Sequence, residues 1–272
     1  MILKKQYLMF IVAVLAMACE VGDKRDESFE DVVLTDSVSE RFTHELGTVR
    51  KNIEQNAGLY NRLFELKCPY NPDLPLPQNT KYDLTHQKAM GFGSYSASFV
   101  YSVSYEQAQE ASNYLDFILS LSEELGIRNA FNESELRELV SNNTEIDKSA
   151  IITRIYLRAT EQLYTEERAI IVSYMVLGGW LEGMKMTYET CGDYLDDEEI
   201  RLGIYDQTYT FYNCKRILET FKEDSEVKKI LTILNSLEPN IEKVIKTRGD
   251  ITQDDFNEMN ILLSNFRKEI YK

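Results

Sequence analysis

The chain has 272 residues, of which 43% are apolar, and a formal net charge of −15 at pH 7. This length and apolar content are enough for one sizeable hydrophobic core. The excess of carboxylates argues against nucleic acid and anionic membrane surfaces as partners, because both attract clustered lysine and arginine. High negative charge also keeps a protein soluble, and this is the simpler interpretation.

The first eighteen residues have the layout of an export signal peptide. Lys4 and Lys5 form a basic start, the apolar run 7–15 is too short for a stable membrane span, and residues 16–18 are a small-residue cleavage site. Cys19 follows directly, as in the lipobox of bacterial lipoproteins, whose cysteine becomes the lipidated first residue. We therefore expect a lipid-anchored protein of the cell envelope, at the outer membrane or in the periplasm. Ordinary cleavage and secretion is the alternative.

Residues 19–37 are acidic and poor in aromatic side chains, which predicts a flexible tether between the anchor and the folded part. From residue 38 to about residue 67, apolar residues recur at intervals of three and four, as in a long helix. This helix would open a single helical domain, 38–272. Residues 68–78 contain four of the five prolines, so we expect an extended surface connection there.

The next segment gives conflicting signals. Between Ser94 and Tyr105, serines alternate with aromatic and apolar residues, which is typical of a strand. No second alternating run could pair with it, and a lone strand would leave its backbone groups unsatisfied. We therefore predict a helix whose small residues allow close packing. Residues 104–107 then fit a capping box for another helix that ends near Gly126.

The segment from Glu167 to Thr190 is predicted to be the central helix, because residues 169–181 carry no charge and are apolar on every side of a helical period. Trp180, the only tryptophan, lies among glycines spaced for close backbone contact. Glu182 is the one charged residue between residues 169 and 184. It must emerge at the helix edge or be buried with a partner, either to fix helix register or to bind a ligand.

Further helices are expected at 132–142, 144–164 and 200–221, with the acidic run 196–199 as a helix cap rather than a cation site. The last part is predicted as three helices, 226–237, 239–248 and 252 to the end, with Pro239 separating the first two. The sequence therefore predicts an all-α, multi-helix bundle of about eight to ten helices around a central apolar helix.

A series of small-residue and aromatic landmarks resembles a group of helical, signal-peptide-bearing envelope proteins from Bacteroidetes. These landmarks are Gly93-Ser94-Tyr95-Ser96-Ala97, Tyr101, Gln107 with Gln109-Glu110, Leu125-Gly126-Ile127, and Gly178 to Gly183. The resemblance covers about residues 89–190 and implies a helical envelope protein, but no particular activity. The position after Ala97 is often aspartate in this group, whereas Ser98 occupies it here.

We find no catalytic motif, and predict no catalytic residue, bound metal or cofactor. The two histidines, His44 and His86, do not complete the paired Glu-x-x-His pattern of a di-iron bundle. Besides Cys19, three cysteines remain, so at most two of them can pair. A disulfide between Cys68 and Cys191 is favoured, because each is expected to close a helix.

The leading hypothesis is therefore a non-catalytic envelope lipoprotein that serves as a helical binding or assembly module, with an envelope protein as its possible partner. The alternative is a small-ligand or metal-binding sensor. Its site would include Glu182 and Trp180, with Tyr95, Ser98 and Tyr101 from the Ser/Tyr-rich helix. A deep polar pocket at these residues would favour the sensor, whereas a filled core with an exposed aromatic patch would favour the module.

Overall fold

The computed structural model describes residues 36–77, 82–139, 141, 143, 146–165 and 168–271. These residues form nine α-helices, two short 3-10 helices and no strand, so the predicted all-α class is confirmed. The predicted signal peptide and Cys19 lie outside the described residues. By its contacts the chain divides into Met1–Glu40, of which only residues 36–40 are described, and a compact unit, Arg41–Lys272.

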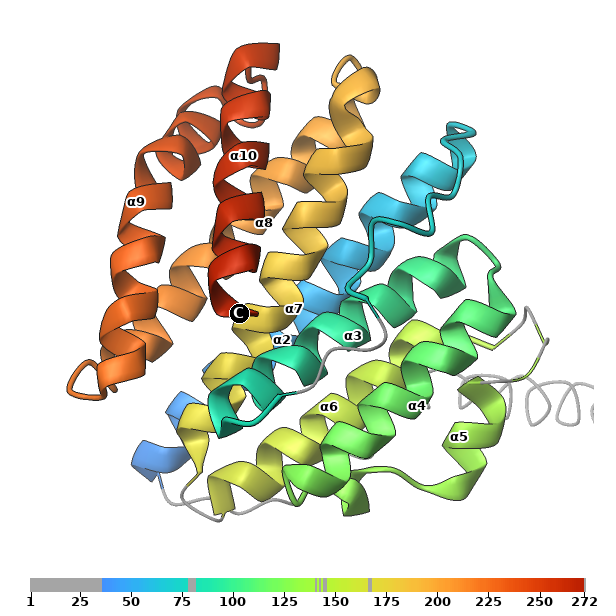
Figure 1. Ribbon diagram of the computed structural model, residues 1–272, viewed down its shortest axis with the longest axis vertical. Helices are drawn as coiled ribbons and strands as arrows, with labels where there is room; N and C mark the ends of the chain where they lie inside the picture. Colours follow the sequence, from blue (N-terminus) through green and yellow to red (C-terminus); the bar gives the residue numbers. More distant parts are fainter. Residues whose placement is uncertain are drawn as a thin grey trace, which may run out of the picture. The chain divides into compact units, whose positions relative to one another are not determined.

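Figure 1 shows the helices in chain order, coloured from blue to red. Their bounds are α2 Asp36–Glu65, α3 Thr85–Ser104, α4 Ala108–Glu124, α5 Glu133–Leu139, α6 Lys148–Thr165, α7 Ala169–Thr190, α8 Glu198–Glu219, α9 Ser225–Thr247 and α10 Gln253–Ile270. The 3-10 helices are η1, Arg128–Ala130, and η2, Cys191–Tyr194. None of the described helices has the length and apolarity that a membrane crossing needs.

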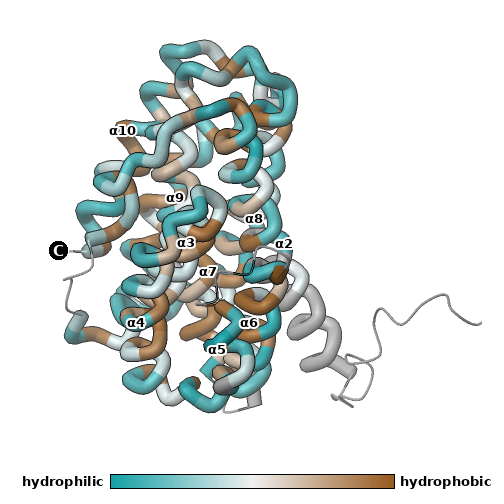
Figure 2. The backbone as a smooth tube through the Cα atoms, turned by 90° about the vertical axis from the view of Figure 1, so that its right-hand side faces the viewer, coloured by the Kyte–Doolittle hydropathy of each residue, from teal (hydrophilic) through white to brown (hydrophobic). Residues whose placement is uncertain are grey.

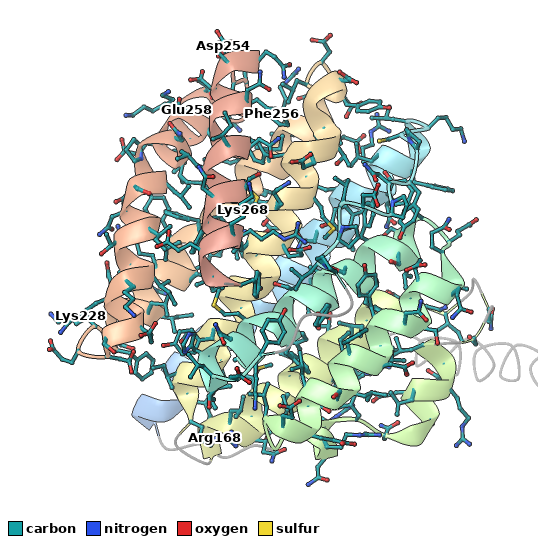
Figure 3. All side chains as sticks on the ribbon, in the orientation of Figure 1. Arg168, Lys228, Asp254, Phe256, Glu258 and Lys268 are labelled. Carbon is teal, nitrogen blue, oxygen red and sulfur yellow. The ribbon has the colours of Figure 1, made fainter. Side chains whose placement is uncertain are left out.

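Helix α7 is the central helix that its charge-free sequence predicts. Its residues from Ile171 to Tyr188 are all buried, because α3, α6, α8 and α10 pack around it. The outer helices are instead amphipathic, and α10 alternates between polar and apolar positions along its length (Figure 2). On α10, Phe256 stacks on Tyr188 of α7 with ring centroids 4.5 Å apart, whereas Asp254 and Glu258 are exposed (Figure 3).

The Ser/Tyr-rich segment is a helix, and its serines explain how it tolerates burial. Ser96 Oγ donates to the Phe92 carbonyl at 2.8 Å. Ser98 and Ser102 likewise donate to carbonyls four residues earlier, at 3.0 and 2.9 Å. Since these hydroxyls are satisfied within their own helix, α3 can be buried continuously from Ala89 to Ser102. The alternating serines that resemble a strand pattern therefore fit a buried helix instead.

Close contact between α3 and α7 depends on glycine, as the sequence predicts. A Cβ atom at Gly93 would lie 1.9 Å from the carbonyl oxygen of Met175, and one at Gly178 would lie 2.0 Å from that of Met90. Neither distance is sterically possible without backbone movement. The two helices therefore meet backbone to backbone, side by side along the middle of the Arg41–Lys272 unit (Figure 1).

Several predicted boundaries are wrong. Ser104 does not cap a helix, because α3 continues through it and ends in a turn where Glu106 has a left-handed φ of 57°. In that turn the backbone N–H of Gln107 donates to the Ser102 carbonyl, a typical helix ending. Helix α6 begins at Lys148 rather than 144, with the Asp147 carboxylate accepting from the backbone N–H of Ala150.

Pro239 does not separate two helices, as predicted, but lies inside the continuous helix α9. The apolar residues on either side of it, Leu234, Leu237, Ile241 and Val244, remain in helical phase and are all buried. Packing of this stripe offsets the hydrogen bond that proline removes, and Pro239 itself is exposed.

Candidate functional site

The five residues predicted for a ligand site are core residues. Relative exposure is 0% for each of them: Tyr95, Ser98, Tyr101, Trp180 and Glu182. A small molecule would have to open the bundle to reach any of them. Tyr95, Tyr101 and Glu182 all contact the 68–77 segment, directly or through Arg267, whereas Trp180 contacts α8.

Trp180 fixes α7 against α8. Its indole N–H donates to the carbonyl of Gln207 at 3.2 Å, and its ring centroid lies 5.4 Å from that of Phe211. Residues two apart on a helix do not face the same side. Trp180 and Glu182 accordingly contact different helices, α8 and α10.

Glu182 is buried with an arginine partner. Its Oε1 atom accepts from Nη2 of Arg267 at 2.9 Å, and Nη1 of the same guanidinium donates to the Leu74 carbonyl at 3.2 Å. Burial raises the pKa of Glu182 to about 7, although Arg267, the backbone N–H of Leu76 and Lys185 each lower it. This arrangement attaches the end of α10 and the 68–77 segment to α7.

A second polar contact supports the same attachment. Ser94 Oγ donates to the Gly178 carbonyl at 2.9 Å and also hydrogen-bonds the Tyr271 hydroxyl, just beyond α10. Neither Arg267 nor Tyr271 is among the residues predicted from the sequence. Arg267 is 85 residues from Glu182 along the chain, and no motif marks either residue.

Tyr95 and Tyr101 fix the proline-rich segment. The Tyr95 hydroxyl donates to the Pro77 carbonyl at 3.0 Å, and the Tyr101 hydroxyl accepts from the backbone N–H of Asn71 at 3.1 Å. The described residues 68–77 are non-helical, as predicted, but the prediction of a surface connection is only partly right. Leu74 and Leu76 are buried, because the segment packs over α3.

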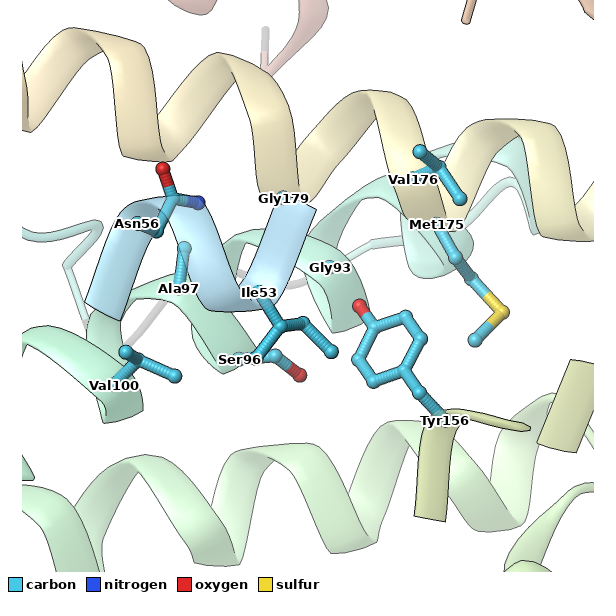
Figure 4. Close-up of a pocket in the computed structure, with 10 residues that line it drawn as sticks. All are labelled: Ile53, Asn56, Gly93, Ser96, Ala97, Val100, Tyr156, Met175, Val176 and Gly179. Atoms are coloured by element: carbon cyan, nitrogen blue, oxygen red, sulfur yellow. The ribbon is translucent and has the colours of Figure 1, made fainter. Parts of the chain in front are cut away.

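A small cavity lies between α2, α3, α6 and α7, and its lining includes Ser96, Ala97 and Gly179, which are chain neighbours of these core residues (Figure 4). It has a volume of about 20 Å³, and its lining includes the polar side chains of Asn56, Ser96 and Tyr156. That volume suits about one water molecule. It is far too small for a metabolite, so this cavity is not a ligand pocket.

A much larger concavity lies at the surface. It has a volume of about 700 Å³ and is formed by the end of α2, the α3–α4 turn, the described residues Ser141 and Asn143, and the start of α6. We call it the α2–α6 groove. Apolar side chains and carboxylates both line it, and they come from three separate parts of the chain. No sequence motif could have indicated it.

The predicted disulfide is not formed in this structure. Cys68, Cys191 and Cys214 are all buried free thiols. Cys68 Sγ faces the Pro69 carbonyl at 3.8 Å, and Cys191 Sγ lies 4.0 Å from Thr190 Oγ1, so each thiol has a local polar neighbour. Burial raises the pKa of Cys191 to about 12 and that of Cys214 further still. High pKa values make these thiols poor nucleophiles.

Within the described residues, no group of three histidine, cysteine, aspartate or glutamate side chains is placed to hold a metal ion. His86 Nε2 lies 3.9 Å from a carboxylate oxygen of Glu226, whereas the side chain of His44 is outside the described set. No family model, curated protein or solved structure matches this chain.

Proposed function

We propose that the protein is a non-catalytic cell-envelope lipoprotein that acts as a helical binding or assembly module. The observation that carries this proposal is the enclosure of every predicted ligand-site residue, from Tyr95 on α3 to Glu182 on α7, at 0% exposure. Their contacts hold helices together, and the cavity beside them is water-sized. The larger concavity lies at the surface, where another protein can reach it.

The exposed large apolar side chains support this proposal less than the groove does. Among the described residues they are Phe64, Leu84, Leu202, Tyr209 and Ile261, of which only Leu202 and Tyr209 share a helix, α8. Of these, Phe64 alone lines the groove. Single exposed apolar residues are normal on a soluble protein, so the groove rather than a broad aromatic patch is the favoured contact site.

The anchor is the second part of the proposal. Cys19 would carry the acyl chains and hold the helical unit at the outer membrane or on the periplasmic side. Cys19→Ser in the full-length chain tests this in a bacterial host that processes lipoproteins. We expect the wild type in the membrane fraction, with the extra mass of its acyl chains, and the variant in the soluble fraction. Identical fractionation and no acyl mass in the wild type would contradict it.

The binding role is tested by cross-linking in intact envelopes, followed by affinity purification of the lipidated form. We expect defined protein partners that are recovered again after stringent washing and that also bind the purified protein. If cross-linking of the wild type repeatedly captures nothing, the module proposal is wrong.

A small-ligand sensor remains the second candidate, and the near-neutral pKa of the buried Glu182 is the observation that favours it. The ion pair with Arg267 already accounts for that carboxylate structurally. Glu182→Gln separates the two functions. Loss of a bound small molecule with unchanged stability would support the sensor, whereas altered stability with no ligand effect supports the structural role.

A further inference from the structure

The α2–α6 groove combines an apolar floor with an acidic rim. Phe64, Val103 and Ile146 contribute the apolar part. Phe64 is 39% exposed, and its ring packs edge-on against Tyr105 with centroids 5.9 Å apart. The ring is therefore held in place while part of it faces solvent, as a contact for an apolar side chain requires.

The groove has more negative than positive side chains. Three carboxylates line it, those of Glu65, Glu106 and Asp147, against one ammonium, that of Lys148. Lys148 Nζ donates to the Ser141 carbonyl at 2.6 Å, so its charge is directed at that oxygen. Glu65 has a basic partner of its own, because Arg62 lies 3.0 Å from it.

Glu106 and Asp147 are the carboxylates that stay available to an occupant. Both are exposed, and no salt bridge is found for either among the described residues. Asp147 uses Oδ1 to cap α6, through the backbone N–H of Ala150 at 2.9 Å. Two carboxylates beside a partly exposed ring suit a chain that carries both cationic and apolar side chains.

We propose that the α2–α6 groove binds a cationic peptide segment of a partner protein. Lysine or arginine side chains would pair with Glu106 and Asp147, while an apolar side chain packs against Phe64 and Ile146. The net charge of −15 on the whole chain attracts such a segment from a distance. This inference rests on the proposed module function and specifies the chemistry of its partner.

The backbone at both positions allows the charges to be removed with little damage to the fold. Glu106 has a φ of 57°, which glycine adopts more easily, so Glu106→Gly removes the carboxylate and relieves strain. Asparagine caps helices as well as aspartate does, so Asp147→Asn keeps the cap of α6. The control is D116N/E219Q, which neutralises the same number of exposed carboxylates on α4 and α8.

The test uses the purified full-length chain and two fluorescent synthetic peptides, Lys-Phe-Lys-Leu-Lys and Glu-Phe-Glu-Leu-Glu. Fluorescence anisotropy should show binding of the cationic peptide only, weakening as salt is added. E106G/D147N should weaken it by about three- to tenfold, which is reasonable for two partly exposed charge pairs, and D116N/E219Q should not. Equal binding of both peptides, or equal binding by E106G/D147N and the control, would overturn the proposal.

Cross-linking in envelopes distinguishes this inference from the module function itself. If E106G/D147N loses the partners that the wild type and the control capture, the groove is the binding site. If it keeps them, the module function stands but the groove is not the site. A wild type that captures no partner while still binding the cationic peptide would contradict the module function alone.

Discussion

Glu182 and Arg267 form an ion pair inside the Arg41–Lys272 unit. The carboxylate is fully buried, and the guanidinium also bonds the Leu74 carbonyl, so three segments meet at one ion pair. Removing one partner of a buried pair typically costs about 3–5 kcal/mol, because the other charge stays buried without compensation. This geometry favours a structural role for the pair.

The raised pKa of Glu182 predicts a particular pH dependence. The ordinary pKa is 4.5 and the folded-state pKa about 7, so the folded chain holds this proton more tightly than the unfolded chain. The resulting stability is fully present below pH 4.5 and is lost as pH rises to about 7. Glu182→Gln removes the titration. The wild type's free energy of unfolding, relative to this variant, should fall by roughly 3 kcal/mol across the window.

Urea unfolding of both proteins at pH 5 and pH 8, as about the ends of that window, measures this difference. Arg267→Met supplies the control, because its cost should be larger at pH 8, where the ionised Glu182 of the wild type gains from pairing with Arg267, than at pH 5. A wild-type minus Glu182→Gln difference that does not change with pH would mean that Glu182 is ionised throughout.

The cysteines give a second prediction at this scale. In the Cys19→Ser chain, Cys68, Cys191 and Cys214 should react slowly with a thiol reagent while folded, because all three are buried and the pKa of Cys191 is raised to about 12. After unfolding in urea without reductant, all three should react. Recovery of a single reactive thiol would instead show that two cysteines are paired, as in the sequence-based hypothesis of a Cys68–Cys191 disulfide.

At the scale of elements, the contact between α3 and α7 determines the arrangement of the core. Gly93→Ala would place a methyl group 1.9 Å from the Met175 carbonyl oxygen and force the helices apart. We expect a loss of about 1–3 kcal/mol or more, measured by chemical unfolding. Gly58→Ala in α2 is the matched control, since no atom lies within 4 Å of its Cβ. It should gain up to about 1 kcal/mol.

A Gly93→Ala variant as stable as Gly58→Ala would contradict the backbone contact. If both variants are less stable than the wild type, α2 also tolerates substitution poorly. The difference between their free energies of unfolding is then the quantity that tests the contact. The account requires the Gly93 variant to be less stable than the Gly58 variant.

Much of the helical architecture can be predicted from the sequence, because periodicity is a local property. The uninterrupted apolar run of α7 shows directly that other helices must surround it, and the absence of a pairing partner excludes a strand in α3. Local rules fail where packing decides the outcome. Pro239 lies within α9 because the buried residues on both sides stay in phase.

The candidate sites were harder to predict. Glu182 is conspicuous in the sequence, but its partner Arg267 is 85 residues away and carries no signal of its own. Without the partner, a buried carboxylate suggests a ligand site as readily as an ion pair. The α2–α6 groove is formed by residues such as Phe64, Glu106 and Asp147, which are brought together only by folding.

At the scale of the whole molecule, buried and exposed polar groups differ in their partners. The interior contains buried serines, an ion pair and Trp180, and these contact other parts of the same chain. The surface carries the acidic groove. Together with the net charge of −15, this supports the proposal that the surface of the helical unit recognises a cationic protein segment.

Iodide quenching of tryptophan fluorescence tests the enclosed core most directly, because Trp180 is the only tryptophan and has 0% exposure. The folded protein should show blue-shifted emission that iodide hardly quenches, with or without the cationic peptide. Unfolding in urea should shift the emission to the red and restore quenching. Efficient quenching of the folded protein would place Trp180 at the surface and contradict the packing of α7 against α8.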